Sequence, residues 1–104
     1  MKFGYHASMC HPDFYIPLAK AAEAAGFNNF VFPDSICFPE IPSKSTYPYN
    51  ESGKGDFLND VPFLDPFTLI PVLASHTSKI RFTTHVMKLP IRQPVLIAKQ
   101  LSSV

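Results

Sequence analysis

Short apolar runs alternate with helix-like runs along this chain, and that alternation constrains the fold more than any other feature. The pairs of a strand-like run and the helix-like run after it are Lys2–His6 with Asp13–Ala25, Asn29–Asp34 with Asp65–Ser78, and Ile80–Val86 with a helix that starts at Gln93. Strand, loop and helix in repeated order are typical of a parallel α/β protein. We therefore expect an α/β fold of about three β/α units.

Local signals mark the ends of the predicted helices. Gly26 follows the first helix and suits the left-handed conformation that closes a helix. Asp65 is placed to cap the second helix, with Pro66 at its first position. Pro71 lies deeper in the second helix, where a missing N–H predicts a kink or a local break.

Three ionisable residues stand where the predicted strands end, namely His6, Asp34 and His85. In parallel α/β folds the chemistry gathers at the carboxyl ends of the strands. Histidine suits proton transfer near neutral pH. A carboxylate at an open rim can accept hydrogen bonds from a heterocycle, and its removal should cost the fold little stability. The structural alternatives are a loop cap for Asp34, a turn role for Ser35 and satisfied structural histidines.

The stretch Ser35–Leu64 separates the second strand from the second helix and contains four prolines and two glycines. Loops of this length in compact domains are usually functional lids or disordered linkers. Its tyrosines and phenylalanines argue against a plain linker, because disordered segments are poor in aromatic residues. We expect a structured loop over the strand ends, lining the substrate side of a pocket, with a mobile surface insertion as the alternative.

Composition argues against several functional classes. Nine Lys and Arg against eight Asp and Glu leave a net charge of +1 without a basic cluster, so we expect no nucleic-acid or membrane partner. The start MKFGYH lacks the features of a signal peptide, and no apolar run approaches the ~18 residues of a membrane span. Cys10 and Cys37 form no CxxC pair, so we expect no disulfide framework and a reduced, cytoplasmic protein. The spacing of His6, Cys10, His11 and Cys37 matches no compact zinc motif, so we expect no metal.

Five sequence blocks occur in a specific order: FVFPDS at 30–35, YPYN at 47–50, FLDPF at 63–67, IRFTTHVMKLP at 80–90 and RQPVLIAKQL at 92–101. Together they resemble the amino-terminal part of the luciferase-like monooxygenase family. That family includes bacterial luciferase, FMN-dependent monooxygenases and oxidoreductases that use coenzyme F420. The long loop and FLDPF look most like the branch that uses coenzyme F420.

The resemblance implies a TIM (β/α)8 barrel, of which residues 1–104 would form a partial domain with the long loop 35–64. The apolar helical pattern after Pro94 continues to Val104 without a Gly or Asn cap. We therefore expect an apparently truncated chain, the front part of a larger enzyme, and no activity from the 104 residues alone.

The resemblance also implies a flavin- or coenzyme F420-dependent oxidoreductase or monooxygenase that transfers a hydride at a (deaza)flavin ring and acts on a small-molecule substrate. Asp34 and His6 are then the expected catalytic residues, with His6 facing the substrate. Several relatives have a histidine acting as acid or base at the position that Ser35 occupies here. The residues expected to hold FMN or coenzyme F420 are Asp34, Ser35, His85, Val86 and Met87.

Family members commonly carry a non-proline cis peptide bond in a bulge at the end of the third strand. Counting back from the start of the third helix places that bond between His85 and Val86, with an ordinary trans bond as the alternative. The alternative function is a non-catalytic, truncated barrel fragment that self-associates, because an open three-stranded sheet leaves an unpaired edge. We expect a homo-oligomer.

Overall fold

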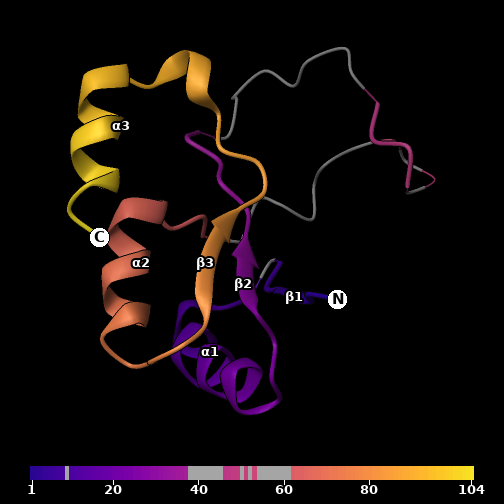
Figure 1. The fold of residues 1–104 in the computed structure, drawn as a ribbon. Helices are drawn as coiled ribbons and strands as arrows, with labels where there is room; N and C mark the ends of the chain where they lie inside the picture. Colours follow the sequence, from indigo (N-terminus) through magenta and orange to yellow (C-terminus); the bar gives the residue numbers. More distant parts are fainter. Residues whose placement is uncertain (9, 38–45, 50, 52, 54–61) are drawn as a thin grey trace.

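Three parallel strands form a single sheet in the order β1-β2-β3 (Figure 1). The computed structural model describes residues 1–8, 10–37, 46–49, 51, 53 and 62–104. Strand β1 spans Gly4–His6, β2 spans Asn29–Phe32 and β3 spans Arg81–Thr84. The α/β class with parallel strands, expected from the alternating runs, is confirmed for this part of the chain.

Each strand is followed by a helix. Helix α1 spans Tyr15–Ala24, α2 spans Pro66–Ala74 and α3 spans Pro94–Leu101. Short 3-10 turns precede two of them, η1 at Pro12–Phe14 and η3 at Leu89–Ile91.

The local signals placed the end of α1 and the start of α2 correctly, whereas α2 ends at Ala74 instead of Ser78 and α3 ends at Leu101 instead of continuing to Val104. Asp65 caps α2, since its side chain accepts a hydrogen bond from the Phe67 N–H at 2.9 Å. Gly26 closes α1 with a φ of 84°. Of the kink or local break expected at Pro71, the break is wrong, because α2 continues through this residue to Ala74; the kink stays a prediction.

The hydrophobic core lies between β2 and the helices α1 and α2. Phe30 and Phe32 on β2 and Leu73 on α2 are fully buried, and alanines of α1 complete the cluster. Because successive side chains of a strand point to opposite faces, Val31 lies on the other face, where it is half-buried. On the neighbouring strands His6 and Thr83 are exposed. Within the described part of the chain, helices therefore cover one face of the sheet and leave the other open.

The carboxylate of Glu23 fastens α1 to the start of β3. It accepts hydrogen bonds from the backbone N–H groups of Ser78, Lys79 and Ile80, with N–O distances of 2.6 to 3.1 Å. These bonds hold the pKa of Glu23 below its ordinary value. The contact lies at the end of the sheet that is opposite to the carboxyl ends of the strands.

No helix in the part of the chain that the structure describes is long and apolar enough to cross a membrane. Most of the predicted loop at 35–64 lies outside the described residues, namely 38–45, 50, 52 and 54–61. The expectation that this loop covers the strand ends therefore stays a prediction.

Candidate functional site

His6 and His85 meet at the carboxyl ends of β1 and β3. Their rings lie edge to face, with centroids 5.6 Å apart, and both side chains are exposed. The pair spans β2, because β2 lies between the two outer strands. The backbone N–H of His85 donates to the carbonyl oxygen of Phe32 at 2.9 Å, which fixes the point where the chain leaves β3. The sequence-based expectation that both histidines face one mouth is confirmed.

The peptide bond between His85 and Val86 is cis, as the resemblance implied. Val86, which follows this bond, is 63% exposed, and Met87 is half-buried. The Met87 carbonyl accepts a hydrogen bond from the Leu89 N–H at 2.9 Å, where the chain turns into η3. The segment after β3 thus presents backbone and an apolar side chain at the strand ends.

Asp34 is buried, which corrects the expectation of a carboxylate at an open rim. Only 2% of its side chain is exposed, and both carboxylate oxygens accept hydrogen bonds from Nη2 of Arg92 at 3.0 and 3.1 Å. Asp34 continues the alternation of Phe30 and Phe32 and so falls on the helix-covered side of the sheet. Its environment is that of a desolvated ion pair, which is costly to break.

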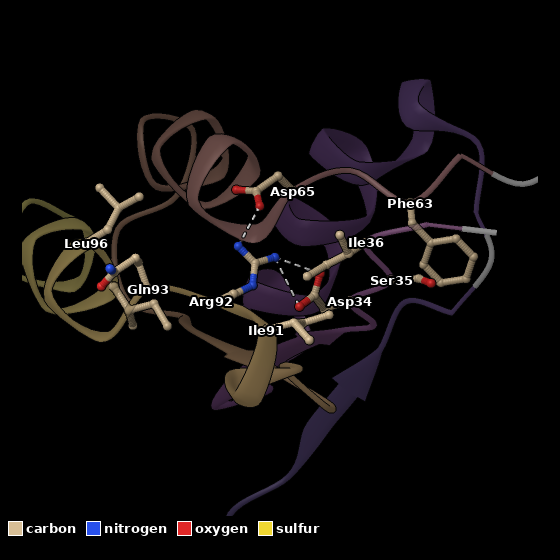
Figure 2. A pocket seen from close by; sticks show the side chains of 10 residues that line it. Asp34, Ser35, Ile36, Phe63, Asp65, Ile91, Arg92, Gln93 and Leu96 are labelled. Atoms are coloured by element: carbon tan, nitrogen blue, oxygen red, sulfur yellow. Dashed lines mark hydrogen bonds and ion pairs between the residues drawn. The ribbon is translucent and has the colours of Figure 1, made fainter. Parts of the chain in front are cut away.

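Arg92 joins three elements through its guanidinium group (Figure 2). Besides Asp34, it binds the carboxylate of Asp65 through Nη1 at 3.0 Å, and its guanidinium carbon lies 5.7 Å from the centre of the Phe67 ring. Burial by itself lowers the pKa of Arg92, but the hydrogen bonds and charges of Asp65 and Asp34 raise it above its ordinary value. The cluster ties the end of β2 to the starts of α2 and α3.

Sequence reasoning missed the role of Arg92 and treated it only as a helix-start marker. One signal was available: a cation just before the first turn of a helix opposes the helix dipole, so it calls for an acidic partner. Sequence reasoning noted Lys88 as a polar group after the third strand but gave it no role; its Nζ lies 3.5 Å from Oγ of Ser35, and its backbone N–H lies 3.4 Å from Oδ2 of Asp34. The Ser35 hydroxyl donates to the Cys37 carbonyl at 3.4 Å.

A pocket of about 370 Å³ opens beside the Arg92 cluster. Figure 2 shows Arg92 with Asp34 and Asp65 in the middle, with Leu96 on one side of them and Phe63 on the other. The lining residues are Asp34, Ser35, Ile36, Phe63, Asp65, Ile91, Arg92, Gln93, Leu96 and Ile97. Ser35, Ile36 and Phe63 belong to the described ends of the predicted loop.

The predicted site residues thus fall into two groups. His6, His85 and Val86 lie at the open strand ends, whereas Asp34 and Ser35 line the pocket between β2, α2 and α3. Lys88 connects the groups, because it follows the cis bond closely and contacts both Asp34 and Ser35. Among the described residues, no group of three or more His, Cys, Asp or Glu side chains is placed to hold a metal ion.

The donors at the strand ends fit a planar, hydrogen-bonding heterocycle. Lys88 supplies a cationic ammonium, Ser35 a hydroxyl, and His6 and His85 supply imidazoles. A flavin or deazaflavin ring needs such groups around its polar edge and an apolar contact for its face. Val86 offers the apolar contact.

Comparison with known proteins gives a consistent result. The family of luciferase-like monooxygenases matches the chain over residues 1–104. The uncharacterized proteins Rv0940c of Mycobacterium tuberculosis and Mb0965c of Mycobacterium bovis are each 48% identical over 103 residues, which cover 99% of this chain. The chain spans 35% of the length of these curated relatives. No solved structure matches the chain significantly.

Proposed function

Since this chain belongs to the luciferase-like monooxygenase family, we propose that the natural full-length protein is a flavin- or coenzyme F420-dependent oxidoreductase acting on a small molecule. The curated relatives are about three times as long as this stretch, because it spans 35% of their length. The activity is therefore proposed for the full-length protein. The finer assignment to a TIM barrel is part of the same proposal.

The observation that carries the proposal is the meeting of His6 and His85 at the carboxyl ends of β1 and β3. Two exposed imidazoles with ring centroids 5.6 Å apart can hold or move a proton beside a bound substrate. Their place agrees with the rule that parallel α/β folds bind ligands at the carboxyl ends of the strands. His6 would face the substrate and His85 the cofactor.

The other residues at the strand ends would bind and orient the ring. Lys88 would donate a hydrogen bond to its polar edge and Ser35 would accept one there, while the backbone and side chains of Val86 and Met87 would lie against its face. Asp34 would act through its bonds to Arg92 and Lys88, because its buried carboxylate is occupied by them. The bound ring supplies the hydride chemistry, and the protein supplies its position and excludes water.

Cofactor titration tests the proposal. The natural full-length protein is titrated with FMN and, separately, with coenzyme F420, and binding is followed by the fluorescence of the cofactor. We expect one of the two to bind, and we expect His6→Ala and His85→Ala to weaken cofactor binding or turnover. His76→Ala is the matched control, because His76 is exposed just after α2, near the start of β3.

Absence of binding by both cofactors would contradict the proposed function. An equal effect of His76→Ala and His85→Ala would instead contradict the placement of the site at the strand ends.

Exposed apolar side chains favour the alternative of a self-associating fragment for the 104-residue chain. Val95, Leu96 and Leu101 on α3 are 79%, 56% and 60% exposed. Apolar surface of this kind is usually covered by another part of the protein or by a partner. Size-exclusion chromatography of the 104-residue chain, together with cofactor titration, distinguishes the proposed oxidoreductase from the self-associating fragment. A monomer that binds cofactor would contradict the fragment alternative.

The charge of the chain bears on its location and partners. We propose a cytoplasmic homo-oligomer without nucleic-acid or membrane partners, in keeping with a net charge of +1 and the absence of a basic cluster from the sequence.

A further inference from the structure

We propose that Arg92 is a positioning residue for the cofactor site, acting at a distance by holding the segment 85–91 against the end of β2. This role rests on the function proposed above. Arg92 lies in the ion-pair cluster with Asp34 and Asp65 rather than beside the two histidines. Its effect on the cofactor would therefore pass through the segment it anchors.

Polar bonds attach this segment to the end of β2. At its start, the His85 N–H donates to the Phe32 carbonyl at 2.9 Å. In its middle, the Lys88 N–H lies 3.4 Å from Asp34 Oδ2. After its end, Arg92 binds both oxygens of Asp34. Asp34 thus accepts the second and third of these bonds, and Lys88 Nζ adds a contact of 3.5 Å with Ser35 Oγ.

Among the described residues, apolar packing contributes little to the position of this segment, in which Met87 is half-buried. Val86, Leu89 and Ile91 are 63%, 57% and 63% exposed, so they bury little of the surface that would fix a loop by the hydrophobic effect. Segments with few buried apolar contacts open at low free-energy cost unless other bonds hold them. The bonds to β2 are therefore expected to decide where the backbone of Val86 and Lys88 lies.

The Arg92–Asp34 bond suits this role because of its geometry and burial. The two side chains are 13% and 2% exposed, so water competes weakly for their hydrogen bonds. Arg92 is also held by the carboxylate of Asp65 at the start of α2, which binds the other terminal nitrogen of the guanidinium group. A lysine would keep the charge but could not reproduce the planar arrangement of donors that reaches both carboxylates.

The test combines cofactor affinity with hydrogen exchange in the natural full-length protein. In Arg92→Met we expect faster exchange of the amides in 86–91 and an affinity for the cofactor lower by about tenfold or more, equivalent to about 1.4 kcal/mol, because the displaced segment contacts the ring less well. Arg92→Lys should give an intermediate result. Asp65→Asn should have a smaller effect, because it leaves the Asp34 bond intact and asparagine also caps helices well.

Leu73→Ala is the matched control for a general loss of stability. Leu73 is fully buried on α2, so its truncation destabilises the fold without touching the Arg92 cluster. We expect it to lower the melting temperature while leaving cofactor affinity and the exchange of 86–91 close to those of the wild type.

An equal loss of affinity in Leu73→Ala and Arg92→Met would overturn the positioning role, and so would unchanged exchange in Arg92→Met. If the wild-type protein binds neither FMN nor coenzyme F420, the proposed function fails. The exchange measurement would then still report separately whether Arg92 holds the segment.

Discussion

Asp34 and Arg92 stand 58 positions apart in the sequence, yet the guanidinium of Arg92 binds both oxygens of the Asp34 carboxylate. The side chain of Asp34 is almost fully buried, and a second carboxylate, that of Asp65, holds Arg92 from the other side. The pair joins the end of the central strand to the residue just before the N-cap of α3. It makes Asp34 a structural anchor as well as a candidate site residue.

Replacement of Asp34 should therefore destabilise the fold. We expect Asp34→Ala to lower the free energy of unfolding by about 3–5 kcal/mol, because it leaves the Arg92 charge buried beside only one carboxylate. Chemical denaturation of the wild type and the variant measures the difference. A loss well below 1 kcal/mol would show that water or Asp65 replaces the missing partner, and would restore the earlier expectation of an open-rim carboxylate.

Tyr15 should be the last of the four tyrosines to ionise. Burial, the nearby Cys10 thiol and its hydrogen bond with Cys10 raise the pKa of Tyr15 from 10.0 to about 12. A raised pKa in the folded state stabilises the protein fully below pH 10.0, and this contribution is lost as the pH rises towards about 12. The ultraviolet absorbance of the phenolates should show one late transition. Tyr15→Phe should remove it, and its persistence in that variant would reject the assignment.

Glu23 should make the fold weaker in acid. Hydrogen bonds from the backbone of Ile80, Lys79 and Ser78 hold the pKa of Glu23 below its ordinary value of 4.5. A lowered pKa in the folded state stabilises the protein above pH 4.5, and this contribution is lost as the pH falls through the lowered value.

Melting temperatures across this acid range check the expectation for Glu23. Glu23→Gln should lower the melting temperature at neutral pH and flatten its dependence on pH below 4.5. The control is Glu51→Gln, because Glu51 is exposed. Equal pH profiles for wild type and Glu23→Gln would count against the role of these bonds.

The two cysteines should differ in reactivity. Both are free thiols, with Cys37 exposed and Cys10 half-buried. Burial raises the pKa of Cys10, so less of the reactive thiolate is present near neutral pH. A thiol reagent should modify Cys37 first. In Cys37→Ser we expect only the slow phase and in Cys10→Ser only the fast one, whereas a single common rate would contradict the structure.

The sequence was sufficient to predict the order of strands and helices, because these depend on local signals. Short apolar runs, the cap at Asp65 and the glycine at position 26 each act within a few residues. The parallel arrangement followed from the strand–helix order. It also brought His6 and His85 to one edge of the sheet, and their ring contact agrees with that expectation. The family resemblance, rather than periodicity, placed the cis bond before Val86.

The tertiary structure alone decided the environment of Asp34. The alternation after Phe30 and Phe32 indicates the face on which Asp34 lies, but it does not say what lies opposite. Arg92 becomes its partner only because the chain returns from β3 over the end of β2 before α3 begins. The strength of an ion pair depends on the distance between the two charged groups and on how deeply they are buried. For residues far apart in the chain, both quantities are fixed by the packing of elements rather than by local propensity.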